Sequence, residues 1–495
     1  MDSDLQSPTE GEQAARDSKG EPLEEALAGS APQEPWIACN LDEATFDAAL
    51  QAYFGFAGVH LPVIIEDAFW QDYRAGRCSL ALVYAIACRG MPFTATPDSW
   101  EKQQRLALKF REKFLEAQQL STGKSAIRLD DLEALAAMVN WTYDEAHGSR
   151  LHSQLGSLFL THESLVLATL QSQTQEYNMA KPASSDLLAR SEERRTLLFW
   201  HVYGLDAFRS LDQKTMSRIP DGENDGVSRK LPRHDSGSYL DAVLNLAIIA
   251  REISQALVTV NTKRKGVKPR DVTTIHERLR RWQKHDCPLH LCRGRDGKGR
   301  LLPLAIDEPS KAQFLRPLQC SILWLLEINC YMQVEDCVSQ YGVQSEAPFE
   351  AEMTALRVEF EALRAVHDGV EISRWMKQHS ATADRGAPVQ GYSLIDLAPS
   401  IARDICAGLC FWICERGKRV LRRGSPRVTN IHPQNRPQEA KDELKDQRKQ
   451  DVSDYISVAK EFRNAVATAT SHRDTQCVLE RLDKQIASFD EALAQ

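Results

Sequence analysis

Apolar residues recur at helical spacing along most of this chain, and this spacing limits the folds that the chain can adopt. One such set steps by four, three and three residues: Leu198, Val202, Leu205 and Phe208. Apolar residues at these intervals lie on one face of an α-helix. The chain has no series of short, alternating β-branched segments, which strands would require. The pattern predicts an all-α fold, with one large helical domain over residues 41–423.

The two ends of the chain differ from this region in composition. Residues 1–35 hold nine acidic side chains against Arg16 and Lys19. With so little apolar surface to bury, this segment is expected to be a disordered acidic tail. Residues 424–451 are polar and contain three prolines, which predicts a linker that runs into helix. Residues 452–495 are predicted to form C-terminal helices.

A seam of apolar residues runs along the end of the chain. It steps alternately by three and four residues: Leu479, Leu482, Ile486, Phe489 and Leu493. The seam is only about two heptads long, whereas a sustained coiled coil needs about three or four. We therefore predict a terminal helix that packs on its own chain rather than a dimerisation zipper.

Composition and charge exclude several classes of protein. The chain has 495 residues, 42% of them apolar, which is enough for a large core. Its net charge of -8 does not suit a protein that coats nucleic acid by bulk electrostatics. The apolar stretch Leu155–Leu170 contains His162 and Glu163 and falls short of a membrane span. The twelve cysteines lie mostly in apolar runs, typical of reduced thiols in a soluble intracellular protein.

The sequence predicts no catalytic group, metal site or cofactor. Residues 121–125 end like a phosphate-binding loop, but Gln118 stands where that loop needs glycine. The best metal-ligand spacing is found in one group: His285, Cys287, His290 and Cys292. Structural zinc sites usually pair two such clusters, and no second pair lies nearby. We interpret the two cysteines as core thiols.

Two stretches carry a recognisable order of residues. Tyr53–Phe69 contains Tyr-Phe, then Pro62, then Phe69. The second reads Glu193-Arg194-Arg195-Thr-Leu-Leu-Phe199-Trp200-His-Val-Tyr203-Gly-Leu-Asp206. Both resemble the "middle homology" regulatory domain of fungal binuclear-zinc-cluster transcription factors, which has Glu-x-Arg-Arg-x-x-Phe-Trp-x-x-Tyr-x-x-Asp. Here the glutamate directly precedes the arginines and one extra residue precedes Phe199.

Later motifs keep the family's order. The family's Gly-Arg-Pro corresponds to Arg218 and Pro220, and its Leu-Pro to Leu231-Pro232. A third stretch has Leu279 and Trp282, then Cys287-Pro288 where the family has Leu-Pro. The resemblance covers roughly residues 45–415 and implies structural roles for these signature residues. We expect Phe199, Trp200 and Tyr203 to broaden the core stripe of their helix. Arg194 and Arg195, at an exposed helix start, are expected to pair with acids, with the binding of an anion as the alternative.

One departure from the family concerns DNA binding. The family's zinc cluster needs six cysteines that open with Cys-x-x-Cys near the N-terminus. Residues 1–77 contain only Cys39, and Cys-x-x-Cys occurs nowhere in the chain. Direct DNA binding through such a module is therefore doubtful. Either the protein regulates transcription without it, or a first exon that encodes it is missing from this sequence. The resemblance then implies a transcriptional regulator that works through the transcriptional machinery or a DNA-binding partner protein, with a small-molecule effector as a further possibility.

Two basic clusters predict import into the nucleus by a carrier that reads exposed basic peptides. The first comprises Lys263, Arg264, Lys265 and Lys268, continued by Arg270. The second comprises Arg416, Lys418, Arg419, Arg422 and Arg423. The alternative for either is a set of solvated cations near a helix end.

For the whole chain, a helical enzyme with a scattered active site and a helical scaffold unrelated to transcription remain alternatives. Control of a metabolic or secondary-metabolite pathway is the function that the resemblance favours.

Overall fold

The structure is a computed structural model that describes residues 34–59, 63–94, 96–120, 128–138, 185–217, 237–297, 302, 314–378, 380–381, 392–423, 438–472 and 474–494. Nearly all of the expected acidic tail lies outside these residues, as do Arg218, Pro220, Leu231 and Pro232. The described residues are almost entirely helical, which confirms the predicted all-α fold. In this part of the chain the strands are β1 (Ser380–Ala381) and β2 (Tyr392–Ser393), which pair antiparallel with Ser380 opposite Ser393.

The N-terminal lobe forms around α3 (Leu80–Gly90), which is buried on nearly all sides because its residues are apolar all round. Gly90 allows α1 to approach closely, since a Cβ there would lie 1.9 Å from the Ala49 carbonyl oxygen. The other elements of the lobe are α1 (Glu43–Ala52), α2 (Glu66–Arg74), α4 (Ser99–Leu120), α5 (Leu129–Met138), and the short turns η2 (Ile37–Cys39), η3 (Tyr53–Ala57) and η4 (Met91–Phe93).

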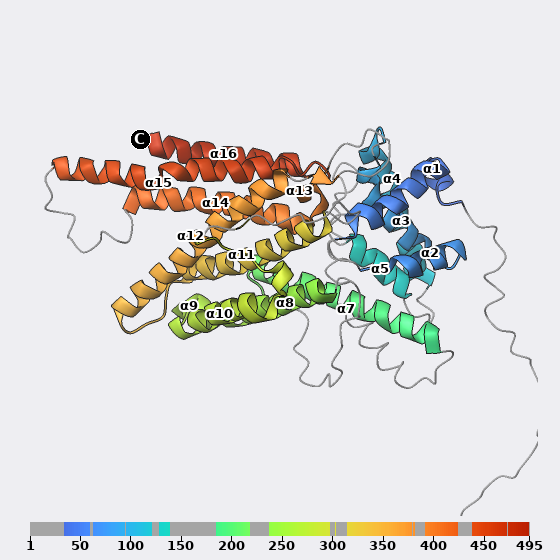
Figure 1. Cartoon of the computed structure of the whole chain (residues 1–495), viewed down its shortest axis with the longest axis horizontal. Coiled ribbons are helices and arrows are strands. Elements are labelled where there is room, and N and C mark those ends of the chain that lie inside the picture. Colours follow the sequence, from blue (N-terminus) through green and yellow to red (C-terminus); the bar gives the residue numbers. More distant parts are fainter. Residues whose placement is uncertain are drawn as a thin grey trace, which may run out of the picture.

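The C-terminal lobe forms around α11 (Leu315–Tyr341), which is likewise buried along most of its length. The other elements are α8 (Gly237–Leu257), α9 (Val260–Lys265), α10 (Pro269–Arg281), η7 (Trp282–Asp286), η8 (Leu289–Leu291), α12 (Pro348–Gln378), α13 (Leu394–Leu397), α14 (Ser400–Arg423), α15 (Gln438–Val466) and α16 (Thr475–Ala494). Figure 1 shows the two lobes side by side. Helix α15 begins inside the segment that the sequence assigned to the linker.

The terminal helix packs on its own chain, as predicted. Leu479, Leu482, Ile486 and Phe489 are buried in the core of the C-terminal lobe. The Phe489 ring lies so close to Gly417 of α14 that a Cβ on this glycine would be 2.2 Å from it. The apolar seam is therefore occupied within the molecule.

Helix α7 (Ser185–Gln213) runs from one lobe into the other (Figure 1). Leu198 and Val202 belong to the core of the N-terminal lobe. Phe208 and Leu211, further along, belong to the core of the C-terminal lobe. One helix therefore contributes to two separate hydrophobic cores.

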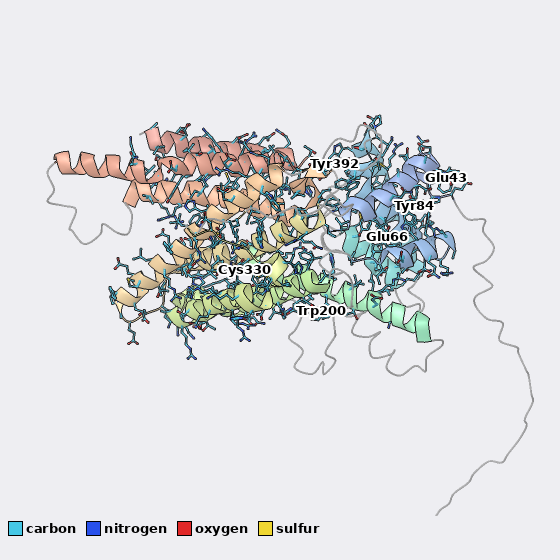
Figure 2. The ribbon with its side chains drawn as sticks, in the orientation of Figure 1. Glu43, Glu66, Tyr84, Trp200, Cys330 and Tyr392 are labelled. Atoms are coloured by element: carbon cyan, nitrogen blue, oxygen red, sulfur yellow. The ribbon has the colours of Figure 1, made fainter. Side chains whose placement is uncertain are left out.

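A second contact joins the lobes away from α7. The Phe56 ring lies 5.9 Å from Phe93 and 5.7 Å from Tyr392, measured between ring centroids. Phe314 adds a fourth ring, 6.1 Å from Phe56. The Tyr392 hydroxyl donates a hydrogen bond to the Pro92 carbonyl oxygen at 3.4 Å, and Figure 2 shows Tyr392 at the boundary between the lobes. This aromatic contact thus joins the lobes in addition to α7.

Candidate functional site

The signature segment Glu193–Asp206 forms the middle of α7, where this helix passes between the lobes. We take this crossing as the candidate functional site. The buried residues move from one face of α7 to another along its length, because the two lobes cover different faces of this helix. Leu198 has no exposed surface, and Val202 is 7% exposed. This arrangement suits a helix that holds two bodies in a fixed relation.

Arg194 fixes the N-terminal lobe to α7 through an ion pair with Glu133 of α5. Its Nη2 lies 2.6 Å from Glu133 Oε2, and its Nε donates to Oε1 at 2.9 Å. The Glu133 side chain is wholly buried, and Asp72 Oδ2 lies 3.6 Å from Arg194 Nη1. Burial raises the pKa of the Glu133 carboxyl, and the hydrogen bonds and charge of Arg194 oppose that shift. Arg194 pairs with an acid as expected, but its pair is not at an exposed surface.

The aromatic residues of the segment form a cluster at the edge of the core. The Trp200 ring lies 5.3 Å from Phe199 and 5.4 Å from Tyr203 between centroids, both edge to face. All three side chains are half-buried, and so is Leu205. Phe199 and Tyr203 pack against the core of the N-terminal lobe, as residues that broaden its stripe would, whereas Trp200 is not among the residues of either core. The physical reason is that the buried face of α7 rotates between the lobes, and neither core covers Trp200 fully.

Asp206 and Tyr203 fix α7 to the C-terminal lobe through Arg251 of α8. Arg251 Nη1 lies 3.7 Å from Asp206 Oδ2, and both side chains are buried. The Arg251 guanidinium also lies over the Tyr203 ring, 4.7 Å from its centroid, a favourable cation–π geometry. Ser210 donates a hydrogen bond to Asp206 Oδ1 at 3.5 Å. The signature segment therefore carries one buried ion pair toward each lobe.

The third signature stretch lies in the core of the C-terminal lobe. Leu279 and Trp282 are buried, and Trp282 Nε1 donates to the Ala242 carbonyl oxygen at 3.1 Å. Pro288 is half-buried. The Cys292 thiol donates to the Cys287 carbonyl oxygen at 3.3 Å, and burial raises the pKa of the Cys287 thiol. Within the described residues no group of three or more histidine, cysteine or acidic side chains is placed to hold a metal ion.

A buried ionic cluster lies between α11 and α12. Arg293 bridges two acids, with Nη2 2.6 Å from Glu327 Oε2 and Nη1 2.8 Å from Asp368 Oδ2. Arg295 Nη2 adds a second contact to Asp368 Oδ2 at 2.5 Å. All the side chains except Arg295 are almost fully buried. The cluster holds the loop after η8 against two helices.

His276 and Tyr331 lie beside this cluster with their polar atoms buried. The two rings are 5.5 Å apart between centroids, and the side chains are 1% and 2% exposed. Among the described residues, both His276 nitrogens, the Tyr331 hydroxyl and Glu327 Oε1 have no hydrogen-bond partner. Burial lowers the pKa of His276 to about 4, so the imidazole is neutral at pH 7. Because buried polar atoms are nearly always hydrogen-bonded, these four atoms are an exception among the buried groups of this lobe.

The two basic clusters differ in exposure. Lys263, Arg264 and Lys265 are exposed at the end of α9, with Lys268 and Arg270 exposed just beyond. In the second cluster, Arg416 is buried and pairs with Glu359, and Lys418 Nζ lies 2.5 Å from Glu415. Arg419 donates to Ser339 at 2.7 Å, while Arg422 is exposed and the Arg423 side chain lies outside the described residues. The second cluster belongs to a packed helix, which argues against its prediction as an exposed import peptide.

A comparison with known families agrees with this architecture. Residues 50–225 match the family model of the fungal specific transcription factor domain. This part of the chain is therefore similar to the fungal specific transcription factor domain, as the resemblance implied. The match includes the whole Glu193–Asp206 signature, whereas Leu279, Trp282 and Pro288 lie beyond it. The chain has no significant match to a curated protein or to a solved structure. Along the described helices, none is long and apolar enough to cross a membrane.

Proposed function

We propose that this chain is a nuclear transcriptional regulator that acts through protein contacts rather than through a zinc cluster of its own. The observation that carries the proposal is the family match over residues 50–225, which includes the helix that joins the two lobes. Its partner would be a DNA-binding protein or a component of the transcriptional machinery. A metabolic or secondary-metabolite pathway is the proposed target.

The same helix suggests how regulation would work. Because Arg194 holds the N-terminal lobe and Asp206 holds Arg251 of the C-terminal lobe, α7 cannot move relative to one lobe without straining a buried ion pair. A partner bound to one lobe would then bias the position of the other, which is a physical route for coupling. This mechanism is part of the proposal.

The buried atoms around His276 and Tyr331 are the proposed place for a small polar effector. They offer a hydroxyl, a neutral imidazole and a carboxylate oxygen without partners, beside the charged Arg293 cluster. A ligand that supplied both donors and acceptors would relieve the cost of burying these groups, about 1–3 kcal/mol for each. It would bind between α10, α11 and α12 and stabilise the C-terminal lobe.

A tethering experiment tests the proposed function. The full chain is fused to a heterologous DNA-binding domain in a fungal cell that carries a matching reporter, with the DNA-binding domain alone as the control. We expect the fusion to change reporter transcription, and deletion of the gene to change a limited set of transcripts. An unchanged reporter together with an unchanged transcriptome would refute the proposal.

The absence of direct DNA recognition is tested on the purified chain. We expect weak binding to duplex DNA without sequence preference, because the chain has no Cys-x-x-Cys and a net charge of -8. Sequence-dependent binding at physiological salt in the range of about 10⁻⁸–10⁻¹¹ M, which is typical of specific sites, would contradict this part of the proposal.

Nuclear import is tested on the exposed cluster of α9. Replacing Lys263, Arg264 and Lys265 by alanine in a fluorescently labelled chain should reduce nuclear accumulation. The matched control replaces Lys284, Lys460 and Lys484, which are exposed outside both basic clusters, and removes the same charge. Equal loss in both variants, or in neither, would exclude α9 as the import signal.

A further inference from the structure

The basic cluster at α9 forms a fixed, exposed surface. Thr259 caps α9, because its hydroxyl accepts a hydrogen bond from the Thr262 amide at 3.1 Å. The loop after α9 is bound to the loop after α11, since the Val267 amide donates to the Gly342 carbonyl oxygen at 2.9 Å. This surface carries five exposed cations: Lys263, Arg264, Lys265, Lys268 and Arg270. We refer to these five residues as the α9 surface.

The α9 surface has no countercharge in the part of the chain that the structure describes. No acidic residue occurs between Glu252 and Asp271, and none of the five cations forms an ion pair with another described residue. Cations of other helices differ in this respect, since Lys109 of α4 lies 2.7 Å from Glu112. Five neighbouring cations without acids create a positive potential that attracts a polyanion.

The acidic tail carries the complementary charge. Residues 1–35 hold nine acidic side chains against two basic ones, which accounts for seven of the eight units of net negative charge. Four of these acids precede Arg16, the first basic residue of the chain: Asp2, Asp4, Glu10 and Glu12. The rest of the chain is close to neutral, so its negative charge is concentrated in the tail.

A path of contacts gives the distance from the end of the tail to the α9 surface. The tail ends in the N-terminal lobe, where the Tyr84 hydroxyl donates to the Pro35 carbonyl oxygen at 3.2 Å. Helix α7 extends about 30 Å from Arg194 to its end, and the Lys214 carbonyl oxygen just beyond accepts from Lys263 Nζ at 3.4 Å. Two layers of helices in the N-terminal lobe add roughly 20 Å. The whole path is therefore roughly 50 Å.

Only the first part of the tail is far enough from Glu34 to span this path. A chain extends at most about 3.3–3.6 Å per residue, so Glu12 can lie up to about 75 Å from Glu34. Glu24 and Glu25 can lie at most about 35 Å away. The reach of the chain therefore selects the acids up to Glu12 and excludes those next to the N-terminal lobe.

We propose that residues 2–12 of the acidic tail dock on the α9 surface of their own chain. Their carboxylates would lie among the five cations and supply the countercharge that this surface lacks. The tether favours this segment over a free polyanion, because it keeps the acids at an effective concentration on the order of 0.1–1 mM. The docking does not depend on the proposed function, but its consequence does: a docked tail competes with an import carrier for the same cations.

Crosslinking of the full chain with a water-soluble carbodiimide tests the docking. The reagent joins a carboxylate to a lysine amine as an amide and takes up the water that is lost. In the monomeric fraction we expect mass spectrometry to find Glu10 or Glu12 joined to lysines of the α9 surface. About 1 M salt should abolish these links, because it reduces the screening length to about 3 Å.

Two exposed lysines serve as controls in the same experiment. Lys460 and Lys484 lie outside the α9 surface and should not be joined to the tail. The proposal is overturned if no tail residue is joined to the α9 surface, or if Lys460 and Lys484 are joined to it equally often. Links that occur only between two chains would also overturn it, because the docking would then not be within one molecule.

Two charge-matched variants test which part of the tail docks. The distal variant neutralises the acids that can reach α9: Asp2→Asn, Asp4→Asn, Glu10→Gln and Glu12→Gln. The proximal variant removes the same charge nearer the N-terminal lobe: Glu21→Gln, Glu24→Gln, Glu25→Gln and Glu34→Gln. Neither set touches a core residue, so both variants should melt like the wild type.

The measurement is the rate at which an activated ester acetylates the lysines of the α9 surface. We expect this rate to rise about twofold or more in the distal variant, as when a site that is occupied at least half of the time is freed. The proximal variant should react at the wild-type rate. Equal rates in all three proteins, or the same increase in both variants, would show that residues 2–12 do not cover the α9 surface.

Discussion

Arg194 of α7 and Glu133 of α5 form an ion pair of 2.6 Å in which the carboxylate has no exposed surface. The two residues are 61 positions apart in the sequence, and they connect the signature segment to the N-terminal lobe. A surface ion pair contributes little to stability, but a buried carboxylate depends on its partner because it has lost its water. This pair is therefore the contact through which the signature segment matters most for folding.

Replacing Arg194 by alanine should destabilise the chain by about 3–5 kcal/mol, the cost of leaving a buried charge without its partner. The double variant Arg194→Met, Glu133→Gln removes both charges and should recover part of that loss. Urea unfolding followed by circular dichroism measures both. A loss below about 1 kcal/mol for Arg194→Ala, typical of a surface pair, would show that Glu133 is solvated.

Trp200→Ala should cost less than Arg194→Ala. A fully buried aromatic residue is worth about 3–5 kcal/mol, but Trp200 is half-buried and contacts mainly Phe199 and Tyr203. We expect a loss of about 2 kcal/mol in the same urea experiment. The reverse order, with Trp200→Ala the more harmful change, would mean that the ring is covered more completely than the structure indicates.

Two glycines should respond to alanine in opposite directions. Gly90→Ala should destabilise the N-terminal lobe by several kcal/mol, because the new methyl group would overlap the Ala49 carbonyl oxygen and force α1 away from α3. Gly204→Ala should stabilise α7 by about 0.5–1 kcal/mol, since a Cβ at this helical position meets nothing within 4 Å. Thermal melts compare the two. A harmless Gly90→Ala would contradict the close packing of α1 on α3.

Stability should decrease as the pH falls from about 6.5 to about 4, because burial lowers the pKa of His276 to about 4 from an ordinary 6.5. Between these values the unfolded chain binds the proton and the folded chain does not, so protonation favours unfolding. The full contribution is present above pH 6.5 and is on the order of 3 kcal/mol. Nearby Glu361 opposes the shift, while Arg357, Arg280 and Arg364 add to it.

His276→Phe isolates this effect, because it keeps an aromatic ring beside Tyr331 and removes the titrating group. Between pH 4.5 and 6.5, its free energy of unfolding should depend less on pH than that of the wild type. The difference in slope corresponds to at most one proton taken up on unfolding. The remaining dependence includes His201 and His472, whose pKa values burial also lowers to about 4. Identical slopes for variant and wild type would mean that His276 is solvated.

Cys477 should be the first cysteine to react with a thiol reagent in the native protein. It is the exposed member of the twelve, whereas the others are buried or half-buried. Titration with a chromogenic disulfide reagent should give one fast equivalent, and Cys477→Ser should abolish it. Two or more fast equivalents would indicate that the core opens around another thiol, and Cys287 is then the informative second variant.

Much of the fold follows from local pattern, because each helix carries its own period. The stepping of Leu198 and Val202 places them correctly in a core, and the short seam from Leu479 to Phe489 is correctly assigned to intramolecular packing. The pattern does not reveal that α7 serves two cores. The spacing of apolar residues predicts which face of a helix is buried. It does not predict which other helices cover that face, because this depends on the tertiary structure.

The polar partners of the signature residues were not predictable. Glu133 follows Asp130 and Asp131 in an acidic run that looks solvated, yet it is wholly buried. Arg251 and Arg293 lie in helical and loop segments with no motif to distinguish them. The basic residues 416–423 resemble a free peptide in sequence, but they belong to α14, and two of them, Arg416 and Arg419, bind acids of neighbouring helices. Charge alone does not indicate whether a side chain faces water.

The passage of α7 through both lobes has a consequence for how the chain can be divided. The family match ends at residue 225, before α8 begins at Gly237. A fragment cut there would keep Phe208 and Leu211 but lose the helices that cover them. Such a fragment would expose the apolar end of α7 and would remove the Arg251 partner of Asp206. The region that defines the family is thus not a self-sufficient folding unit, and a premature stop codon far downstream would also compromise the signature helix.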